Sequence, residues 1–123
     1  MTSAIIVFAH GARDPQWAGS FQQLRERLQA QLPTHTIRLA FLELMTPSLE
    51  DCVADLAAAG VLQLTIIPAF MARGAHLRRD LPELVDTLRM RFPQLHIKVS
   101  EALGEAAPIQ QAMVQWIADE LGE

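Results

Sequence analysis

The stretch AIIVFAHGARDP, residues 4–15, carries an apolar run straight into a histidine and a glycine. Residues 4–9 are apolar and rich in β-branched side chains, which is typical of a strand buried on both faces of a parallel sheet. Asp14 and Pro15 then form a usual helix start, because aspartate caps the first turn and proline fits it. The stretch therefore predicts a strand, a turn that presents the His10 imidazole, and a helix.

The rest of the chain repeats this alternation. Strand-like runs occupy residues 4–9, 36–42, 62–68 and 95–100, and helix-like runs occupy 15–31, 47–59, 81–91 and 107–121. Thr46 with Pro47, and Asp80 with Pro82, predict the starts of the second and third helices, and Gly60 predicts the end of the second. Strands that alternate with helices in this way form parallel sheets with helical crossovers. We expect a single α/β domain over residues 1–123, with a four-stranded parallel sheet flanked by helices on both faces.

Composition excludes several classes of protein. The net charge of −4 argues against nucleic acid as a partner, because phosphate binding needs a basic face. No apolar run approaches the roughly 20 residues that span a bilayer, so no membrane partner is expected. The first residues carry no basic leader, which favours the cytoplasm. The single cysteine, Cys52, excludes an internal disulfide and is expected to be a buried apolar side chain on a helix.

Polar side chains gather where the predicted strands end. In open parallel sheets, ligands bind beyond the carboxyl ends of the strands. The residues expected there are His10, Glu43, Arg73, His76 and Glu101. His35 and His96 fall near the opposite edge, and we interpret them as structural or solvent-facing. Two histidines and a carboxylate suit cobalt, nickel, iron or zinc, and imidazole also accepts protons. Position alone also fits hydrogen-bonded structural histidines.

The loop after the third predicted strand is unusually apolar. Phe70, Met71 and Ala72 stand where polar residues are normal, so they are expected either to line an apolar pocket or to pack in the core. Gly11 and Gly74 are either ordinary loop glycines or positions where a flat ligand lies against the backbone.

Three motifs carry a resemblance to a known family. HGARDP (10–15), FLELMTPSLED (41–51) and IPAFMARGAHLRRDLPELV (67–85) resemble the small sirohydrochlorin metal chelatases of the CbiX type. These lyases insert cobalt, or in relatives nickel or iron, into a modified tetrapyrrole. The resemblance covers nearly the whole chain. It implies a chelatase-like three-layer fold, a homodimer with facing clefts, and a place in cobalamin or sirohaem biosynthesis.

The resemblance also implies roles for individual residues. His10 matches a metal ligand that accepts protons, and His76 matches a second metal ligand that also contacts substrate. Glu43 matches an acidic cleft residue that contacts substrate or helps to guide the metal. Met71, Ala72, Arg73, Gly74 and Ala75 match a loop that lies along the tetrapyrrole. Relatives often have a small residue in place of Arg73, which here either holds a substrate carboxylate or is solvated. The divalent metal is a substrate, and no permanent cofactor is expected.

Other functions fit the residues less well. Histidine phosphatases have an arginine before the phosphorylated histidine, whereas Ala9 precedes His10 here. A non-enzymatic metal carrier or assembly protein using His10 and His76 is the main alternative, but it leaves the apolar loop without a purpose. Among metals, cobalt is favoured and iron comes next. The residues leave the metal, the pathway and the role of Glu101 open.

Overall fold

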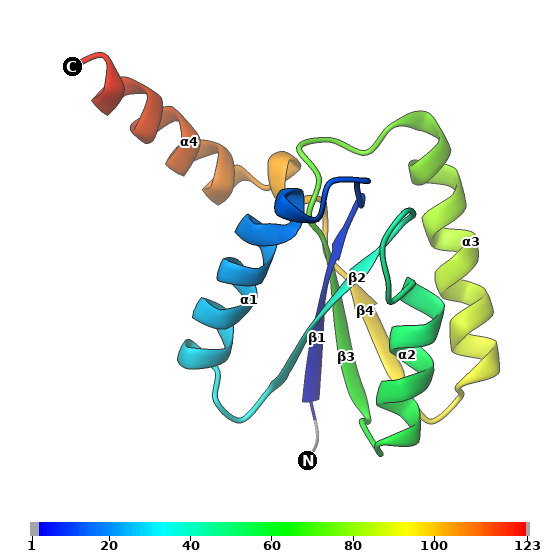
Figure 1. Cartoon of the computed structure of the whole chain (residues 1–123). Coiled ribbons are helices and arrows are strands. Elements are labelled where there is room, and N and C mark those ends of the chain that lie inside the picture. Colours follow the sequence, from blue (N-terminus) through cyan, green and yellow to red (C-terminus); the bar gives the residue numbers. More distant parts are fainter. Residues whose placement is uncertain (1–2, 123) are drawn as a thin grey trace.

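The computed structural model describes residues 3–122 and contains one parallel sheet (Figure 1). Its strands are β1 (Ser3–Ala9), β2 (Thr36–Phe41), β3 (Gln63–Pro68) and β4 (His96–Val99). They lie in the order β2-β1-β3-β4, and every neighbouring pair is parallel. The predicted four-stranded parallel sheet is confirmed, and the strand that leads to His10 lies inside it.

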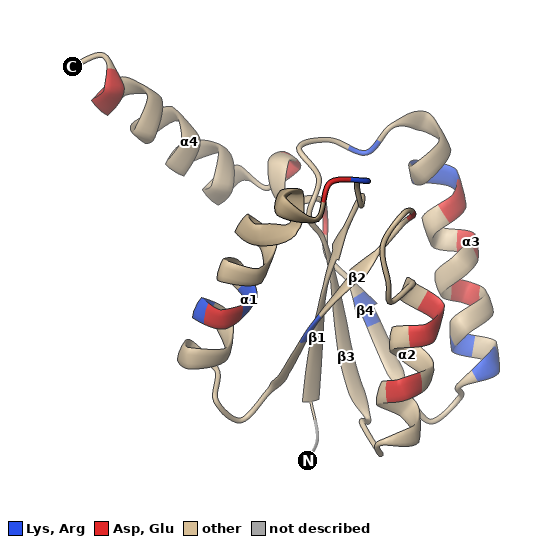
Figure 2. Ribbon diagram, in the orientation of Figure 1, with Lys and Arg blue, Asp and Glu red and all other residues tan. Residues whose placement is uncertain are grey.

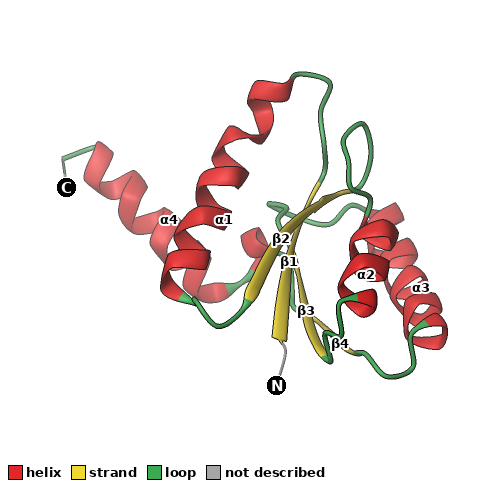
Figure 3. Cartoon of the chain, turned by 60° about the horizontal axis from the view of Figure 1, so that its bottom comes forward, coloured by secondary structure: helices red, strands yellow, loops and turns green. Residues whose placement is uncertain are grey.

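Helices lie on both sides of this sheet (Figures 1 and 3). The α-helices are α1 (Gly19–Gln31), α2 (Leu49–Ala58), α3 (Ala75–Arg91) and α4 (Ala107–Glu120), and short 3-10 helices η1 (Pro15–Ala18) and η2 (Leu103–Glu105) precede α1 and α4. Alternate β1 residues Ala4, Ile6 and Phe8 pack against α2 and α3 in the main core. Residues of η1 and α1 pack on the opposite face, around Ala9 and Phe41. The predicted α/β layering is confirmed.

Local capping agrees with the sequence in part. The Asp14 carboxylate accepts from the Gln16 N–H at the start of η1, and Gly60 follows α2 with a φ of 85°. The predicted cap at Thr46 is wrong. Ser48 is the N-cap of α2, because its hydroxyl accepts from the Asp51 N–H and Pro47 lies in the turn before the helix.

The third helix begins six residues earlier than predicted. Its N-cap is Gly74, and the Arg78 N–H already donates to the Gly74 carbonyl. Pro82, which suggested a first turn, lies inside α3 on an exposed position. Ala75 and His76 therefore belong to the first turn of a helix and not to a loop, which fixes the backbone of His76.

The last helix, α4, does not pack on the sheet as the other three helices do. No residue of α4 is buried, and its packing within residues 3–122 is essentially confined to η2. Figures 1 and 3 show α4 directed away from the sheet. The other helices therefore cover the sheet without it. None of the helices within residues 3–122 is long and apolar enough to cross a membrane.

Candidate functional site at the carboxyl edge of the sheet

The turns after β1 and β2 are joined by backbone hydrogen bonds. The Leu42 N–H donates to the Ala9 carbonyl at 2.9 Å, and the Glu43 N–H donates to the His10 carbonyl at 3.1 Å. Gly11 has a φ of 95°, and a Cβ there would collide with the carbonyl of Glu43. Only glycine fits such a position, because it tolerates positive φ and leaves room for the neighbouring backbone. The pattern HGA thus sets two strand ends side by side.

This pairing brings two predicted site residues into contact. The His10 Nε2 lies 2.9 Å from the Glu43 Oε1, and their side chains are 54% and 56% exposed. A carboxylate only accepts hydrogen bonds, so Nε2 carries the shared proton. In the neutral imidazole this leaves a lone pair on Nδ1. A carboxylate that orients a histidine and raises its basicity is the usual arrangement at metal ligands and proton acceptors.

Aromatic and aliphatic side chains border this pair. The Phe70 ring meets the His10 ring nearly at right angles, with centroids 6.2 Å apart, and also meets Phe8 in the core. Leu42 and Leu44 flank Glu43 in the sequence and are 43% and 59% exposed, and Met71, which follows Phe70, is 70% exposed. Exposed apolar side chains around a polar pair are typical of a ligand-binding surface. Phe70 itself is half-buried in this arrangement.

The backbone beside Glu43 is also unusual. Leu44 has a φ of 67°, and Met45 donates a tight backbone hydrogen bond of 2.8 Å to the Glu43 carbonyl. Such a conformation is uncommon for a branched residue and tends to occur where a site holds it in place. This uncommon conformation lies directly after Glu43, within the candidate site.

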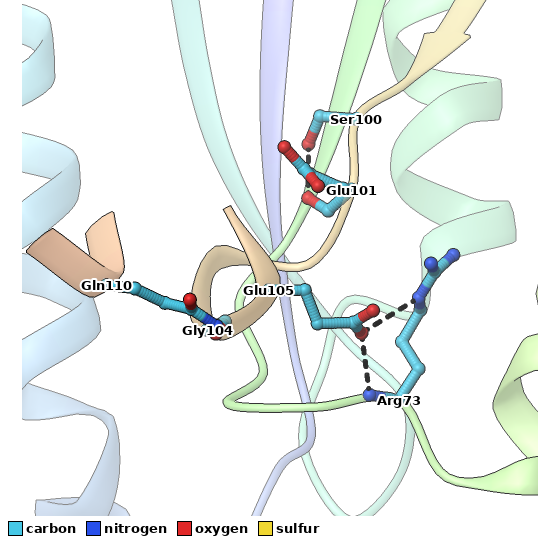
Figure 4. A network of polar contacts seen from close by, with 6 residues as sticks. All are labelled: Arg73, Ser100, Glu101, Gly104, Glu105 and Gln110. Carbon is cyan, nitrogen blue, oxygen red and sulfur yellow. Dashed lines mark hydrogen bonds and ion pairs between the residues drawn. The ribbon is translucent and has the colours of Figure 1, made fainter. Parts of the chain in front are cut away.

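A second cluster of polar contacts, between the loop at residues 70–73 and the 3-10 helix η2, holds the predicted substrate loop in place (Figure 4). Both the backbone N–H and the Nε of Arg73 donate to Glu105 Oε1, at 3.0 and 3.3 Å. These bonds hold the pKa of the Glu105 carboxyl below its usual value. The Gly104 N–H donates to the Phe70 carbonyl at 2.9 Å, and a Cβ at Gly104 would collide with the Met71 backbone. The loop is therefore held at residues 70–73.

Glu105 is the site residue that the sequence did not reveal. It lies 32 residues after Arg73, on a short 3-10 turn with no recognisable motif. Arg73 itself is half-buried and forms an ion pair with Glu105, so its side chain is not simply solvated. Its two terminal nitrogens donate no hydrogen bond within residues 3–122, which leaves them available to a carboxylate.

Glu101 lies near Arg73. Both residues line a cavity of about 370 Å³ between α3 and the end of β4, together with Ser100 and Arg89. The structure brings four of the five residues expected in one crevice together in two pairs. His10 and Glu43 meet at the ends of β1 and β2, and Arg73 and Glu101 share the cavity beside β4.

His76 has a basic side chain as its hydrogen-bond partner. It is exposed on the first turn of α3, and its Nδ1 lies 3.2 Å from the Arg79 Nη2. Arginine only donates, so Nδ1 accepts and Nε2 carries the proton. No hydrogen bond or ring contact joins His76 to His10 within residues 3–122, and no three His, Cys, Asp or Glu residues in that range form a metal-binding group. Figure 2 shows basic residues on the loop before α3 and on α3 itself.

A parallel sheet with an imidazole–carboxylate pair beyond its carboxyl edge defines an α/β protein built to bind a ligand there. Residues 4–120 match the family model CbiX, so the chain belongs to the CbiX family. The predicted family is thereby confirmed.

Several known proteins are similar to this chain. A sirohydrochlorin cobaltochelatase of Saccharolobus solfataricus is 26% identical over 117 residues, which are 90% of each chain. A sirohydrochlorin cobaltochelatase of Methanopyrus kandleri is 28% identical over 82 residues, 67% of this chain and 57% of the relative. This chain thus matches little more than half of that relative's length. A solved CbiX structure from Marinobacter aquaeolei VT8, assigned to cobalamin (vitamin B12) biosynthesis, is 31% identical, covers 98% of both chains and has a TM-score of 0.83.

Proposed function

We propose that this chain is a sirohydrochlorin metal chelatase, a lyase that inserts a divalent metal into a modified tetrapyrrole. The observation that carries the proposal is the His10–Glu43 pair at the carboxyl edge of the sheet, 2.9 Å apart, in a chain of the CbiX family. Relatives named as sirohydrochlorin cobaltochelatases support the substrate.

The pair suits the chemistry of metal insertion. A divalent metal replaces two pyrrole N–H protons, so the reaction needs a group that accepts protons close to the ring. Before transfer, the free lone pair of His10 Nδ1 binds the metal ion. Once the metal has moved to the ring, this lone pair accepts one of the two protons and Glu43 stabilises the imidazolium that results, while the second proton leaves to water at this exposed site. Cobalt, iron and nickel all accept imidazole ligands; we propose cobalt as the main substrate and iron as the next.

The loop after β3 supplies the surface for the ring. In this proposal Met71 and Ala72 lie along the tetrapyrrole together with Gly74 and Ala75, and Arg73 binds one of its carboxylates. The exposed side chain of Met71 and the two unused nitrogens of Arg73 support this role. An exposed arginine at the other turn, Arg13, suits a second carboxylate.

The proposal has two further parts: a second metal ligand, which requires a change in the contacts of His76, and a homodimer, which requires a second copy of the chain. His76 acts as a second metal ligand once its Nδ1 is released from Arg79 or its proton moves from Nε2. The chain works as a homodimer in the cytoplasm, with the clefts of the two copies close together, in cobalamin or sirohaem biosynthesis.

Anaerobic absorbance of sirohydrochlorin tests the function directly. The protein is mixed with Co²⁺, Fe²⁺ or Ni²⁺ in turn, against matched samples without protein. A protein-dependent spectral change with at least one metal is expected, and its rate ranks the metals. A folded protein that accelerates none of them contradicts the proposal. Tight Co²⁺ binding without any insertion would assign the protein as a metal carrier.

A further inference from the structure

The cavity between α3 and the end of β4 combines apolar walls with charged groups. Its volume is about 370 Å³. Apolar side chains of the helix and the strand line one part of it: Leu81, Pro82, Val85 and Val99. Polar and charged residues line the rest: Arg73, Asp86, Arg89, Ser100 and Glu101. Such a mixture is typical of a site for a small ligand group with an apolar stem and a polar end.

Two of the charged residues balance each other. The Arg89 Nη1 donates to the Asp86 Oδ1 at 3.3 Å, and the Arg89 Nη2 donates to the Ile97 carbonyl at 2.7 Å. The Ser100 hydroxyl donates to the Glu101 carbonyl at 2.8 Å, so its proton is also engaged. The charges left for a ligand are therefore those of Arg73 and Glu101.

Arg73 is the cation that a ligand can use. Its Nε donates to Glu105, and the two terminal nitrogens, which donate to no residue among 3–122, are directed away from Glu105 in Figure 4. The side chain is only 25% exposed, and its backbone N–H is bonded to the same carboxylate, so its position is fixed. The paired N–H groups of a guanidinium match the two oxygens of a carboxylate.

Glu101 supplies an opposing charge in the same cavity. Its carboxylate makes no hydrogen bond or ion pair with the described residues 3–122. An unpaired carboxylate repels anions, and it repels a doubly charged ion more strongly than a singly charged one. The charge of Arg73 is also partly balanced by Glu105. The cavity therefore suits a carboxylate on a short apolar stem better than it suits phosphate.

The cavity lies within reach of a ring bound beside His10. The Phe70 ring meets the His10 ring, and Arg73 follows Phe70 by three residues. Three residues of extended chain span at most about 11 Å, which limits the distance between the two backbones. A polycarboxylate tetrapyrrole carries its carboxylates on short methylene stems around its rim. A ring beside His10 can thus direct one of these side chains toward Arg73.

We propose that this cavity binds one carboxylate side chain of the tetrapyrrole. The terminal nitrogens of Arg73 bind the carboxylate, the apolar residues of α3 contact the methylene stem, and Glu101 disfavours phosphate and other doubly charged anions. The inference rests on the proposed function, because it places one side chain of that substrate. It also gives Glu101 a role in specificity.

Titration of the full chain with metal-free sirohydrochlorin, followed by fluorescence, tests the placement. Arg73→Gln should weaken binding by about tenfold, as expected for the loss of a charged hydrogen-bond partner. Ser100→Phe fills the cavity without a change of charge and should also weaken binding. Since both variants remove the same contact, the double variant should bind little worse than either single one. Unchanged affinity of Ser100→Phe, or losses that simply add, overturns the placement.

Glu101→Gln tests the specificity. This variant should bind sirohydrochlorin about two- to fivefold more tightly, because a like charge is removed from the cavity. Inorganic phosphate should compete with sirohydrochlorin more strongly in the variant than in the wild type. Glu83→Gln removes the same charge from an exposed position of α3 outside the cavity, and it is the matched control. Equal effects of the two substitutions overturn the role of Glu101.

Propionate separates the cavity from the chelatase function, because it has the same carboxylate and stem but no ring. In two-dimensional NMR spectra, propionate should shift the amide signals of Val99, Ser100 and Glu101 in the wild type and not in Arg73→Gln. A chain that inserts metal but shows no such shift overturns the cavity site and leaves the proposed function standing. Shifts in a chain that inserts no metal remove the proposed function and keep the carboxylate site.

Discussion

His10 and His76 are both exposed imidazoles near the carboxyl edge of the sheet, yet their partners have opposite character. A carboxylate accepts from His10 Nε2, whereas a guanidinium donates to His76 Nδ1. The first partner raises the electron density on the ring and attracts a cation or a proton, and the second repels both. Two residues of the same type therefore offer different chemistry, and the difference lies entirely in what stands beside them.

The backbone elements that carry His10 and His76 differ as well. His10 follows a central strand, on a turn that only Gly11 permits, and its ring rests against Phe70. His76 lies on the exposed first turn of α3, in a helix that turns its buried side toward the sheet through Leu81 and Val85. His10 is thus held before any ligand arrives, while Arg79 is the one residue within 3–122 that hydrogen-bonds to the His76 side chain.

The largest effect is expected from removing the preorganised histidine. His10→Ala should lower the rate of metal insertion by about 100-fold or more, the usual contribution of a positioned proton acceptor. The fold should persist, because the side chain is 54% exposed. Initial rates from absorbance and the thermal midpoint measure the two effects. His35→Ala, at the opposite edge of the sheet, is the control. Full activity of His10→Ala would remove His10 from the mechanism.

Glu43→Gln tests whether His10 needs the negative charge of Glu43 or only a hydrogen bond from Nε2 to its side chain. Glutamine can still accept from His10 Nε2, so the ring keeps its orientation but loses the nearby negative charge. We expect the insertion rate to fall by roughly 10- to 100-fold, as for the loss of other carboxylates behind metal-binding histidines. An unchanged rate would show that Glu43 acts only by positioning the His10 ring.

His76 and Arg79 are best tested together, because the comparison predicts effects of opposite sign. If His76 is a metal ligand, His76→Ala should weaken Co²⁺ binding by at least roughly tenfold, the lower end of what an outer-shell partner is worth. Arg79→Gln removes a competing donor and a positive charge, so it should tighten binding by about two- to fivefold. Competition with a metal-sensitive dye measures both affinities.

The control is the double variant. In a His76→Ala background, Arg79→Gln should no longer improve Co²⁺ binding. If Arg79→Gln tightens binding equally in both backgrounds, the arginine acts through its charge alone, and His76 is not a ligand.

Local patterns account for what the sequence predicts correctly. Four apolar runs, of which the one before His10 is the clearest, identify the four strands. Because the strands are parallel, their carboxyl ends lie at one edge of the sheet. The contact of His10 with Glu43 follows from β1 and β2 being neighbours. The start of α3 was missed because Asp80 and Pro82 imitate a helix start inside a longer helix.

Other features depend on contacts that no local pattern carries. Glu105 reaches Arg73 only because η2 folds over the loop after β3. The apolar stripe of α4 predicts that the helix is covered, but it does not say by which surface. Residues such as these are set by the tertiary arrangement, and sequence periodicity reports only that a face must be buried.

The smallest effect is expected at Glu105, which holds the loop before α3 through Arg73. Its bonds to Arg73 keep the pKa of the folded carboxyl below the ordinary value of 4.5. A carboxyl whose pKa is lower in the folded state contributes stability above its unfolded pKa, and this contribution is lost as the pH falls through the folded pKa. Wild type should therefore lose part of its stability below about pH 4.5.

Urea midpoints measured between pH 3 and pH 6 test this contribution. Glu105→Gln should show a flatter dependence on pH across the acidic part of that range, together with a higher KM for sirohydrochlorin, since the loop from Met71 to Gly74 loses one of its two anchors. Glu101→Gln removes a carboxyl that makes no side-chain hydrogen bond or ion pair within residues 3–122, so it should keep the wild-type dependence. If both variants follow the wild type in acid, the Arg73–Glu105 pair does not hold the loop, and the rigidity of this side of the site comes from the Gly104–Phe70 hydrogen bond alone.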